Sequence, residues 1–298
     1  MHLLITGAWS EAERYIPELE RMRHETVFLQ WEQDELPCQY DWPEGVICNG
    51  LFLHHPIERF TSLRFIQLTS AGFDKIPVDY VREHGIEIHN ARGVYSIPMA
   101  EFAVCGVLQL YKQSRFFQEN QKAHRWEKRR GLIELFGKTV LIVGCGSVGT
   151  ECSKRFKAFG CRVIGVNRTV RDDAWFDRIV PMDCLDDALT DADVVILSLS
   201  LTEHTRYLLD ADRLSRLKPG AVLVNISRGA LVDTDALQNA LPNLGGAVLD
   251  VFDEEPLPED SPLWDKENVI VSPHNSFAGD GDGKRLASVV FENLKSVI

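Results

Sequence analysis

Short runs of aliphatic and β-branched residues alternate with amphipathic stretches along the whole sequence of 298 residues. Several runs, such as Val194–Leu197, are apolar at every position, which is typical of strands covered by helices on both faces. This repetition predicts an α/β fold built from parallel sheets with right-handed crossovers. The predicted strands are Leu3–Thr6, Thr26–Leu29, Val46–Cys48, Leu63–Leu68, Ile86–His89, Thr139–Val143, Arg162–Val166, Val194–Leu199, Ala221–Ile226, Ala247–Leu249 and Val269–Val271.

The distribution of these strands predicts two sheets, one from residues 1–95 and one from residues 96–278. A long helix is expected to begin near Ser96 or Pro98 and to run towards Phe116, since serine caps helices and proline fits their first turn. The final segment, Gly279–Ile298, has the apolar spacing of one amphipathic helix, which can pack on either sheet.

Charge and composition exclude several classes of protein. The formal net charge of −12 and the pI of about 5.2 disfavour binding to nucleic acid or to anionic lipid. No apolar run reaches the roughly 18 residues of a membrane span, and the first residues make a poor signal peptide. The 7 cysteines are odd in number and include no C-x-x-C pair, which predicts a reducing, cytoplasmic location and no metal site.

A charged segment, Gln118–Arg130, follows the long predicted helix. We interpret it as a solvated connection to the next strand. The alternative is a basic rim that attracts an anion.

A glycine-rich loop joins the predicted strand Thr139–Val143 to a predicted helix, Thr150–Phe159. Gly144 permits a tight turn, Gly146 lets backbone N–H groups approach a pyrophosphate, and Gly149 allows close packing of strand and helix. The context predicts a dinucleotide site, the alternative being a glycine turn that binds nothing. The residues of this sequence that we expect at the site are Gly144, Gly146, Ser147, Val148, Gly149 and, after a neighbouring strand, Ser198.

The end of the following strand bears on the choice of cofactor. An acidic residue there binds the adenosine ribose hydroxyls and repels a 2′-phosphate, whereas this sequence has Asn167, Arg168 and Thr169. A guanidinium suits a 2′-phosphate, so we expect NADP(H) to be favoured, with NAD(H) possible. Two observations weaken the preference for NADP(H). Asp172 and Asp173 lie just beyond Arg168 in the sequence, and Arg168 can simply be a solvated side chain.

Three polar residues, Arg228, Glu255 and His274, follow successive predicted strands. Ligands bind beyond the carboxyl ends of strands in an open parallel sheet, so the three are expected to come together. Arginine can bind a carboxylate through two hydrogen bonds, histidine can protonate the alkoxide formed by hydride transfer, and glutamate can orient the histidine. Each residue also has an ordinary alternative as a solvated loop side chain.

At these positions the sequence resembles the D-isomer-specific 2-hydroxyacid dehydrogenases. The resemblance runs from about Leu63 to the C-terminus and rests on the segments Thr69–Asp74, Asn90–Ser96, Lys218–Gly229, Asp250–Pro256 and Ser272–His274. It implies that Arg228, Glu255 and His274 are catalytic and that Asp250 contacts the nicotinamide carboxamide. It also implies that Ser70, Ala71 and Gly72, together with Arg228 and His274, bind the substrate.

The resemblance further implies an architecture and an activity. A Rossmann dinucleotide-binding domain, 96–278, is inserted into a flavodoxin-like substrate domain, 1–95 and 279–298, with the active cleft between them. The expected substrate is a small 2-keto or 2-hydroxy acid such as glyoxylate or hydroxypyruvate, and the expected assembly is a homodimer built on the long helix. The alternative is a dinucleotide-sensing binding protein of the corepressor type on the same fold.

Overall fold

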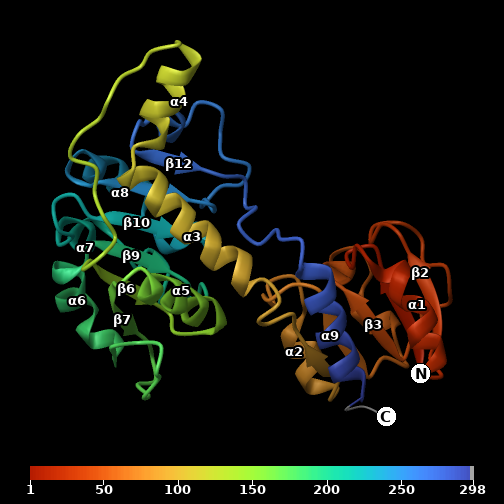
Figure 1. Ribbon diagram of the computed structural model, residues 1–298. Coiled ribbons are helices and arrows are strands. Elements are labelled where there is room, and N and C mark those ends of the chain that lie inside the picture. Colours follow the sequence, from red (N-terminus) through yellow and green to blue (C-terminus); the bar gives the residue numbers. More distant parts are fainter. Residues whose placement is uncertain (296–298) are drawn as a thin grey trace. The chain divides into compact units, whose positions relative to one another are not determined.

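The computed structural model describes residues 1–295, which divide into two compact units (Figure 1). Unit 1 comprises Met1–Tyr95 and the chain from Gly279 onward, and unit 2 comprises Ser96–Ala278. Each unit contains one wholly parallel sheet with helices on its faces, which confirms the predicted α/β fold class. Within the described residues, no helix has both the length and the apolar character needed to cross a bilayer.

Unit 2 is built on a sheet of 7 strands in the order β12-β11-β10-β9-β6-β7-β8. The first strand of this unit, β6, lies in the middle of the sheet, and β7 and β8 follow it towards one edge. The strands β9 to β12 then extend from β6 to the other edge, as in a Rossmann fold. The strands are β6 (Thr139–Val143), β7 (Arg162–Val166), β8 (Arg178–Val180), β9 (Val194–Leu197), β10 (Val222–Asn225), β11 (Gly246–Leu249) and β12 (Val269–Val271). The order reverses between β6 and β9, and the carboxyl ends of those strands form the expected ligand crevice.

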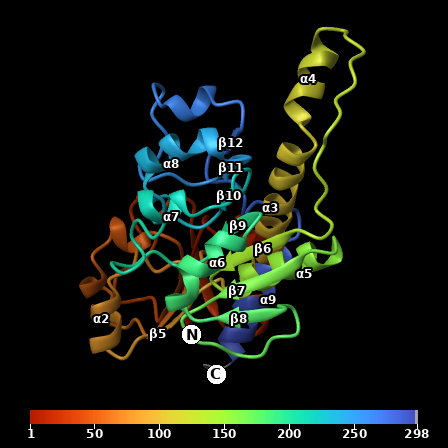
Figure 2. The same cartoon turned by 90° about the vertical axis from the view of Figure 1, so that its left-hand side faces the viewer.

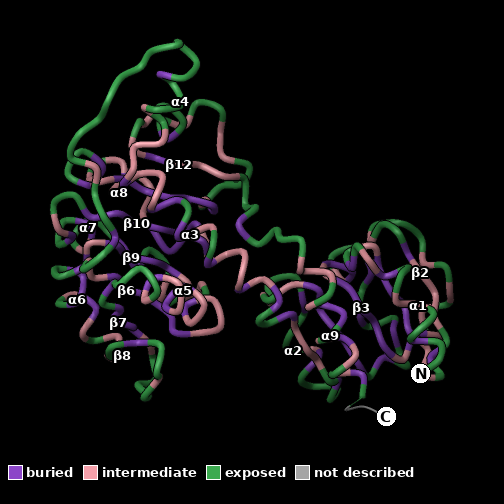
Figure 3. The backbone as a smooth tube through the Cα atoms, viewed as in Figure 1, coloured by how far each residue is buried: buried purple, intermediate pink, exposed green. Residues whose placement is uncertain are grey.

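Alternate residues of these strands supply two separate cores, because successive side chains of a strand point to opposite faces. Leu141 and Val143 pack on one face, and Val140 and Ile142 pack on the other. Figure 3 shows the strands of this sheet as buried. The first face is covered by α6 (Leu185–Asp191), α7 (Ala211–Ser215) and α8 (Thr234–Ala240), and the second by α3 (Ser96–Tyr111) and α5 (Ser147–Ala158).

Unit 1 has a sheet of 5 strands in the flavodoxin-like order β2-β1-β3-β4-β5. The strands are β1 (His2–Thr6), β2 (Glu25–Leu29), β3 (Gly45–Cys48), β4 (Phe65–Leu68) and β5 (Glu87–His89), and the helices are α1 (Ala12–Arg21), α2 (Val78–Glu83) and α9 (Asp282–Lys295). Leu286, Val290 and Leu294 of α9 are buried against β1 residues Leu3 and Ile5. Helix α9 therefore completes the core of a sheet formed by the first part of the chain.

Two predicted helix boundaries differ in the structure, and one strand is present that the sequence pattern does not predict. The long helix ends at Tyr111 and not near Phe116, because Gln113 adopts a left-handed conformation (φ 50°) before a second helix, α4 (Ser114–Lys122). The sequence pattern does not predict the edge strand β8, which begins with the charged Arg178 and so lacks the apolar run of β12, a strand of the same length. The predicted helix Gly279–Ile298 begins at Asp282, and its residues 296–298 lie outside the described part of the chain.

Helix α4 and the segment that follows it, residues 123–136, extend away from the sheet of unit 2 (Figures 1 and 2). We call α4 and this segment the arm. Most of its residues are exposed, including Trp126, whose side chain is 96% exposed, and Phe136, at 77%. The basic residues of the segment Gln118–Arg130 thus lie on a projecting element of unit 2.

Candidate functional site

The glycine loop connects β6 to α5 and has little room for larger residues at two of its positions. Gly144 has a φ of +99°, and a Cβ there would lie 2.8 Å from the backbone nitrogen of Leu199. A Cβ on Gly149 would lie 2.1 Å from the carbonyl oxygen of Gly144. At Gly146, by contrast, no heavy atom lies within 4 Å of the Cβ position, so the loop is open on that side.

This open side coincides with the start of α5. Gly146 is the N-cap residue of this helix of 12 residues and provides no side-chain cap for the first N–H groups, which include those of Ser147 and Val148. Uncapped N–H groups and the helix dipole favour an anion at this position. The loop therefore fits the pyrophosphate of a dinucleotide, with Gly146, Ser147 and Val148 as the donors.

Two predicted cofactor residues also hold the loop in place. The Ser198 hydroxyl donates to the carbonyl oxygen of Gly144 (2.7 Å). The Asn167 amide accepts from the N–H of Cys145 (3.3 Å) and donates to the carbonyl oxygen of Thr169 (2.9 Å). Burial raises the pKa of the Cys145 thiol to about 12, so this cysteine stays neutral and acts as an apolar filler.

Asp250 directly follows β11, is fully buried and binds the loop after β12. Its two carboxylate oxygens accept hydrogen bonds from the Ser272 hydroxyl (2.6 Å) and from the N–H groups of Asn275 (2.8 Å) and Ser276 (3.0 Å). Its carbonyl oxygen accepts from the N–H of His274 (2.7 Å). A buried carboxylate needs such partners, and here they fix the turn on which His274 is carried.

His274 and Glu255 form a hydrogen-bonded pair at this edge of the sheet. The Nδ1 atom of His274 lies 2.8 Å from Oε2 of Glu255, and both side chains are partly exposed. The other carboxylate oxygen of Glu255 accepts from the N–H of Phe252 (3.0 Å), which fixes its orientation. With Nδ1 facing the carboxylate, Nε2 is the nitrogen that can exchange a proton with a ligand.

Arg228 follows β10, in a turn braced by the side chain of Asn225. The Asn225 amide donates to the carbonyl oxygen of Arg228 (2.9 Å), and the guanidinium of Arg228 donates to the carbonyl oxygen of Ser227 (2.8 Å). Next to it, a Cβ on Gly229 would lie 1.8 Å from the carbonyl carbon of Phe252. Gly229 therefore brings the Arg228 turn against the segment whose backbone N–H binds Glu255.

The three candidate residues of unit 1, Ser70, Ala71 and Gly72, follow β4. Their carbonyl oxygens accept hydrogen bonds within the unit, for example from the N–H of Ala91 to Ser70 (2.9 Å) and from the Asn90 amide to Ala71 (2.7 Å). Their own N–H groups make no hydrogen bond to any residue within 1–295. Three successive free N–H groups are suited to binding an anion.

Sequence reasoning missed Gly229 and the partners of Asp250. For Asp250 a signal was available: an acidic residue directly after an apolar strand of a parallel sheet is expected to be buried and to need donors. No comparable signal marked Gly229, because its importance depends on how closely two loops approach in space.

Comparison with known proteins decides the family. A model of the NAD-binding domain of D-isomer-specific 2-hydroxyacid dehydrogenases matches residues 104–276. The chain belongs to this family. It is 34% identical to a glyoxylate reductase of Korarchaeum cryptofilum, with 94% of this chain and 90% of the relative covered.

Solved structures of this family agree in fold. A family protein from Aeromonas salmonicida matches with a TM-score of 0.85 and 30% identity, covering 99% of this chain and 95% of that one. A glyoxylate reductase from Paecilomyes thermophila matches with a TM-score of 0.86 and 26% identity, covering 99% and 94%. This 2-hydroxyacid dehydrogenase is therefore an oxidoreductase with a nicotinamide-cofactor domain of the Rossmann type.

Proposed function

We propose that this dehydrogenase reduces a small 2-keto acid to the D-2-hydroxy acid and prefers NADPH to NADH. The observation that carries the proposal is the 2.8 Å contact between His274 Nδ1 and Glu255 Oε2 at the carboxyl edge of a dinucleotide-binding sheet. Glyoxylate and hydroxypyruvate are the substrates we would test first, since a glyoxylate reductase is among the similar proteins.

In the proposed mechanism, the nicotinamide supplies the hydride when the cofactor is bound. His274 donates the proton from Nε2 to the substrate carbonyl oxygen as that oxygen becomes an alkoxide. Glu255 orients the imidazole through Nδ1, so that Nε2 faces the substrate. The carbonyl carbon accepts the hydride, the carbonyl oxygen takes the π electron pair and one proton from His274, and the keto group becomes a hydroxyl group.

The remaining residues bind and orient. Arg228 provides a planar guanidinium that can hold the substrate carboxylate through two hydrogen bonds and polarise the carbonyl beside it. We propose that the N–H groups of Ser70, Ala71 and Gly72 also donate to that carboxylate. Asp250 is fully buried and both its carboxylate oxygens accept hydrogen bonds, so we propose that it acts by holding the His274 turn; the nicotinamide contact that the family resemblance implies would need its side chain to become accessible.

The test is a panel of small 2-keto acids assayed with NADPH and with NADH. We expect oxidation of the reduced cofactor with at least one keto acid of two or three carbons, and a higher kcat/KM with NADPH. If no keto acid is reduced with either cofactor while both cofactors bind, the catalytic proposal is wrong and the alternative of a dinucleotide-sensing protein replaces it.

The preference for NADPH is proposed on Asn167, which replaces the usual acidic residue, and on Arg168. Arg168 is exposed and forms no ion pair within residues 1–295, so its charge is available to a 2′-phosphate. A hydrogen bond to a charged group contributes about 1.5–3 kcal/mol, so Arg168→Ala should raise KM for NADPH about 10- to 100-fold. KM for NADH is the internal control and should stay unchanged; an equal rise for both cofactors would contradict the assignment.

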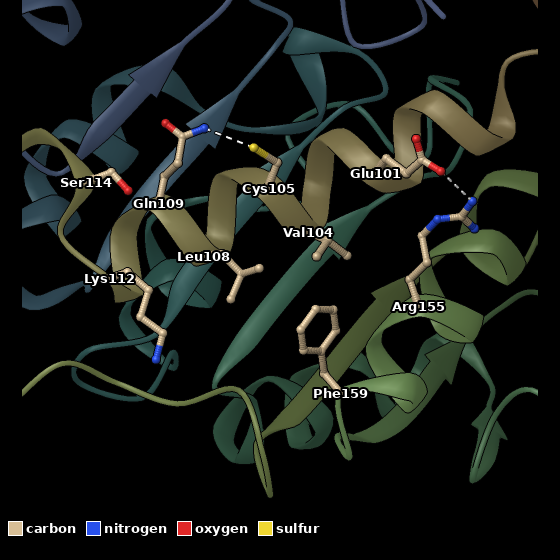
Figure 4. Close-up of a pocket in the computed structure, with 9 residues that line it drawn as sticks. All are labelled: Glu101, Val104, Cys105, Leu108, Gln109, Lys112, Ser114, Arg155 and Phe159. Carbon is tan, nitrogen blue, oxygen red and sulfur yellow. Dashed lines mark hydrogen bonds and ion pairs between the residues drawn. The ribbon is translucent and has the colours of Figure 1, made fainter. Parts of the chain in front are cut away.

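We also propose that the protein is a homodimer that uses the outer face of α3. A groove of about 510 Å³ lies between α3 and α5, with a mainly apolar lining that includes Val104, Leu108 and Phe159 (Figure 4). The arm lies on the same unit and exposes Trp126 and Phe136. Exposed apolar side chains on one unit are the kind of surface that another copy of the chain can cover.

Cys105 offers a test of this dimer, since it is exposed and lines the groove. Cys105→Arg would place a long charged side chain in the covered face and should shift the protein from dimer to monomer in light scattering. The matched control is Asn239→Arg, on α8 and thus on the opposite face of the sheet, which should leave the mass unchanged. A dimer that persists with Cys105→Arg would exclude this face as the interface.

A further inference from the structure

Tyr207 lies between β9 and α7 and has a backbone conformation that is rare for its residue type. Its φ is 50°, in the left-handed region that favours glycine, so a tyrosine there strains the backbone. Residues in such conformations persist only where the surrounding structure fixes them, and they cluster at functional sites. The proposed function so far assigns no role to Tyr207.

The backbone of Tyr207 is anchored to the segment that follows Arg228. Its N–H donates to the carbonyl oxygen of Ala230 (2.7 Å), and two residues later the N–H of Leu209 donates to the carbonyl oxygen of Leu231 (3.0 Å). Leu209 is fully buried in the core of unit 2. The position of Tyr207 beside the Arg228 turn is therefore fixed by contacts that do not involve its side chain.

The side chain of Tyr207 reaches a second loop of the candidate site, residues 252–255. Its hydroxyl donates to Oδ2 of Asp253 (2.6 Å), a charge-assisted hydrogen bond that raises the pKa of Tyr207. The hydroxyl oxygen accepts from Nη2 of Arg206 (3.0 Å), so the hydroxyl hydrogen is directed to Asp253.

Arg206 is a second partner of Asp253, but a weaker one. Its Nη2 lies 3.6 Å from Oδ1 of Asp253, and the two side chains are 52% and 34% exposed. An exposed ion pair of this length contributes little, because both charges are well solvated. The hydroxyl of Tyr207 is therefore the main anchor of Asp253.

Asp253 leads directly to the pair formed by Glu255 and His274. The residue before Asp253, Phe252, donates its N–H to Oε1 of Glu255 (3.0 Å). The other carboxylate oxygen of Glu255, Oε2, lies 2.8 Å from Nδ1 of His274. A shift of Asp253 would therefore move the N–H that orients Glu255 and, through Glu255, the imidazole.

We propose that Tyr207 is a positioning residue for the reduction of the keto acid. Its backbone holds the Arg228 turn and its hydroxyl holds the loop that orients Glu255, so that it sets the direction in which the imidazole delivers its proton. The inference rests on the proposed function in taking His274 as the proton donor. The strained backbone of Tyr207 follows from placing one residue across two loops.

The first variant is Tyr207→Phe, which retains the ring and the backbone contacts and removes only the hydroxyl. The measurement is the rate of cofactor oxidation in a single turnover at saturating keto acid. Loss of a hydrogen bond to a charged group should lower this rate about tenfold. KM for the keto acid and Kd for the reduced cofactor should change little, because neither the Arg228 turn nor the glycine loop is bonded to the hydroxyl.

Tyr207→Gly separates positioning from stability. Glycine adopts a φ of 50° without strain, so Tm should equal or exceed that of the parent, whereas the single-turnover rate should fall at least as far as in Tyr207→Phe. A purely structural residue would lose stability and rate together. Tyr111→Phe is the matched control: its hydroxyl donates to the carbonyl oxygen of Asp193 (3.5 Å), just before β9, and its loss should leave the rate unchanged.

Variants of the two partners test the contact itself. Asp253→Ala should also lower the single-turnover rate about tenfold. Adding Tyr207→Phe to it should lower the rate little further, because the two residues act through one contact. Arg206→Met removes the exposed ion pair and should lower the rate about twofold or less.

The results that overturn the inference differ from those that overturn the proposed function. If the parent oxidises no reduced cofactor with any keto acid, or if His274→Ala keeps the parent's rate, the proposed function fails and the inference fails with it. If His274→Ala is inactive but Tyr207→Phe keeps the parent's rate, only the inference is wrong. The same holds if the effects of Tyr207→Phe and Asp253→Ala multiply, or if Tyr207→Gly loses stability and rate together.

Discussion

His274→Ala is expected to lower kcat for keto-acid reduction about 10²- to 10⁴-fold, the usual contribution of a positioned acid or base. The imidazole is the proposed proton donor, and no other histidine is paired to a carboxylate at the carboxyl edge of the sheet of unit 2 within the described residues. Alanine cannot replace this donor. The measurement is kcat for glyoxylate or hydroxypyruvate under saturating NADPH.

Binding of the cofactor separates a chemical role from a structural one. The turn that carries His274 is held by backbone N–H groups of Asn275 and Ser276 and by the Ser272 hydroxyl, none of which is lost with the imidazole. Kd for NADPH should therefore stay near that of the parent. His204→Ala, at an exposed position of the same unit, is the matched control and should retain full kcat. Normal turnover by His274→Ala would exclude the assigned role.

Gly229→Ala is expected to damage both the stability and the activity of the protein. The added Cβ would lie 1.8 Å from the carbonyl carbon and 2.0 Å from the carbonyl oxygen of Phe252, and backbone atoms cannot rotate away. Overpacking of this kind costs about 3 kcal/mol, which lowers Tm by about 6–12 °C for a unit of this size. The loop of Gly229 carries Arg228, and the loop of Phe252 provides the N–H that binds Glu255. A shift of about 1 Å between these loops should therefore also lower kcat/KM about 100-fold.

Gly220→Ala provides the comparison for this variant. Gly220 has a φ of +81°, but no heavy atom lies within 4 Å of its Cβ position. Alanine there should cost only the strain of a left-handed backbone, about 1–2 kcal/mol, with unchanged kcat/KM. If Gly229→Ala has the Tm and kcat/KM of the parent, the close approach of the two loops is not required for the site.

The fold was predictable from the sequence where local pattern decides structure. Runs such as Val194–Leu197 are apolar on both faces, and this pattern alone specifies a strand in a covered parallel sheet. Local pattern failed at Gln113, which ends α3 with a left-handed conformation that glycine or asparagine usually provides. Local pattern failed again at β8, which begins with a charged residue and is specified by its pairing with β7.

The candidate site was predictable to the extent that it follows from strand ends. Arg228, Glu255 and His274 each follow one of three adjacent strands, β10, β11 and β12, and the structure pairs the last two residues. The sequence could not show that Asp250 binds the His274 turn, because these hydrogen bonds join residues that are distant along the chain. The roles of these residues in catalysis stay predictions until the variants are measured.

The position of α9 has a consequence for the order of events during synthesis. Arg285 of α9 donates to the carbonyl oxygen of Val94 (2.6 Å), and Asn293 donates to Gln67 (2.7 Å), so the first sheet is completed by the last helix. Unit 2 lies in the sequence between the strands of unit 1 and helix α9. The ribosome therefore synthesises all of unit 2 before it synthesises α9. At about 5–20 residues per second, the sheet of unit 1 waits about 10–40 s before α9 covers its share of a core that until then is packed only by α1 and the residues near it. Chaperones that shield apolar strands would act on the N-terminal segment during this interval.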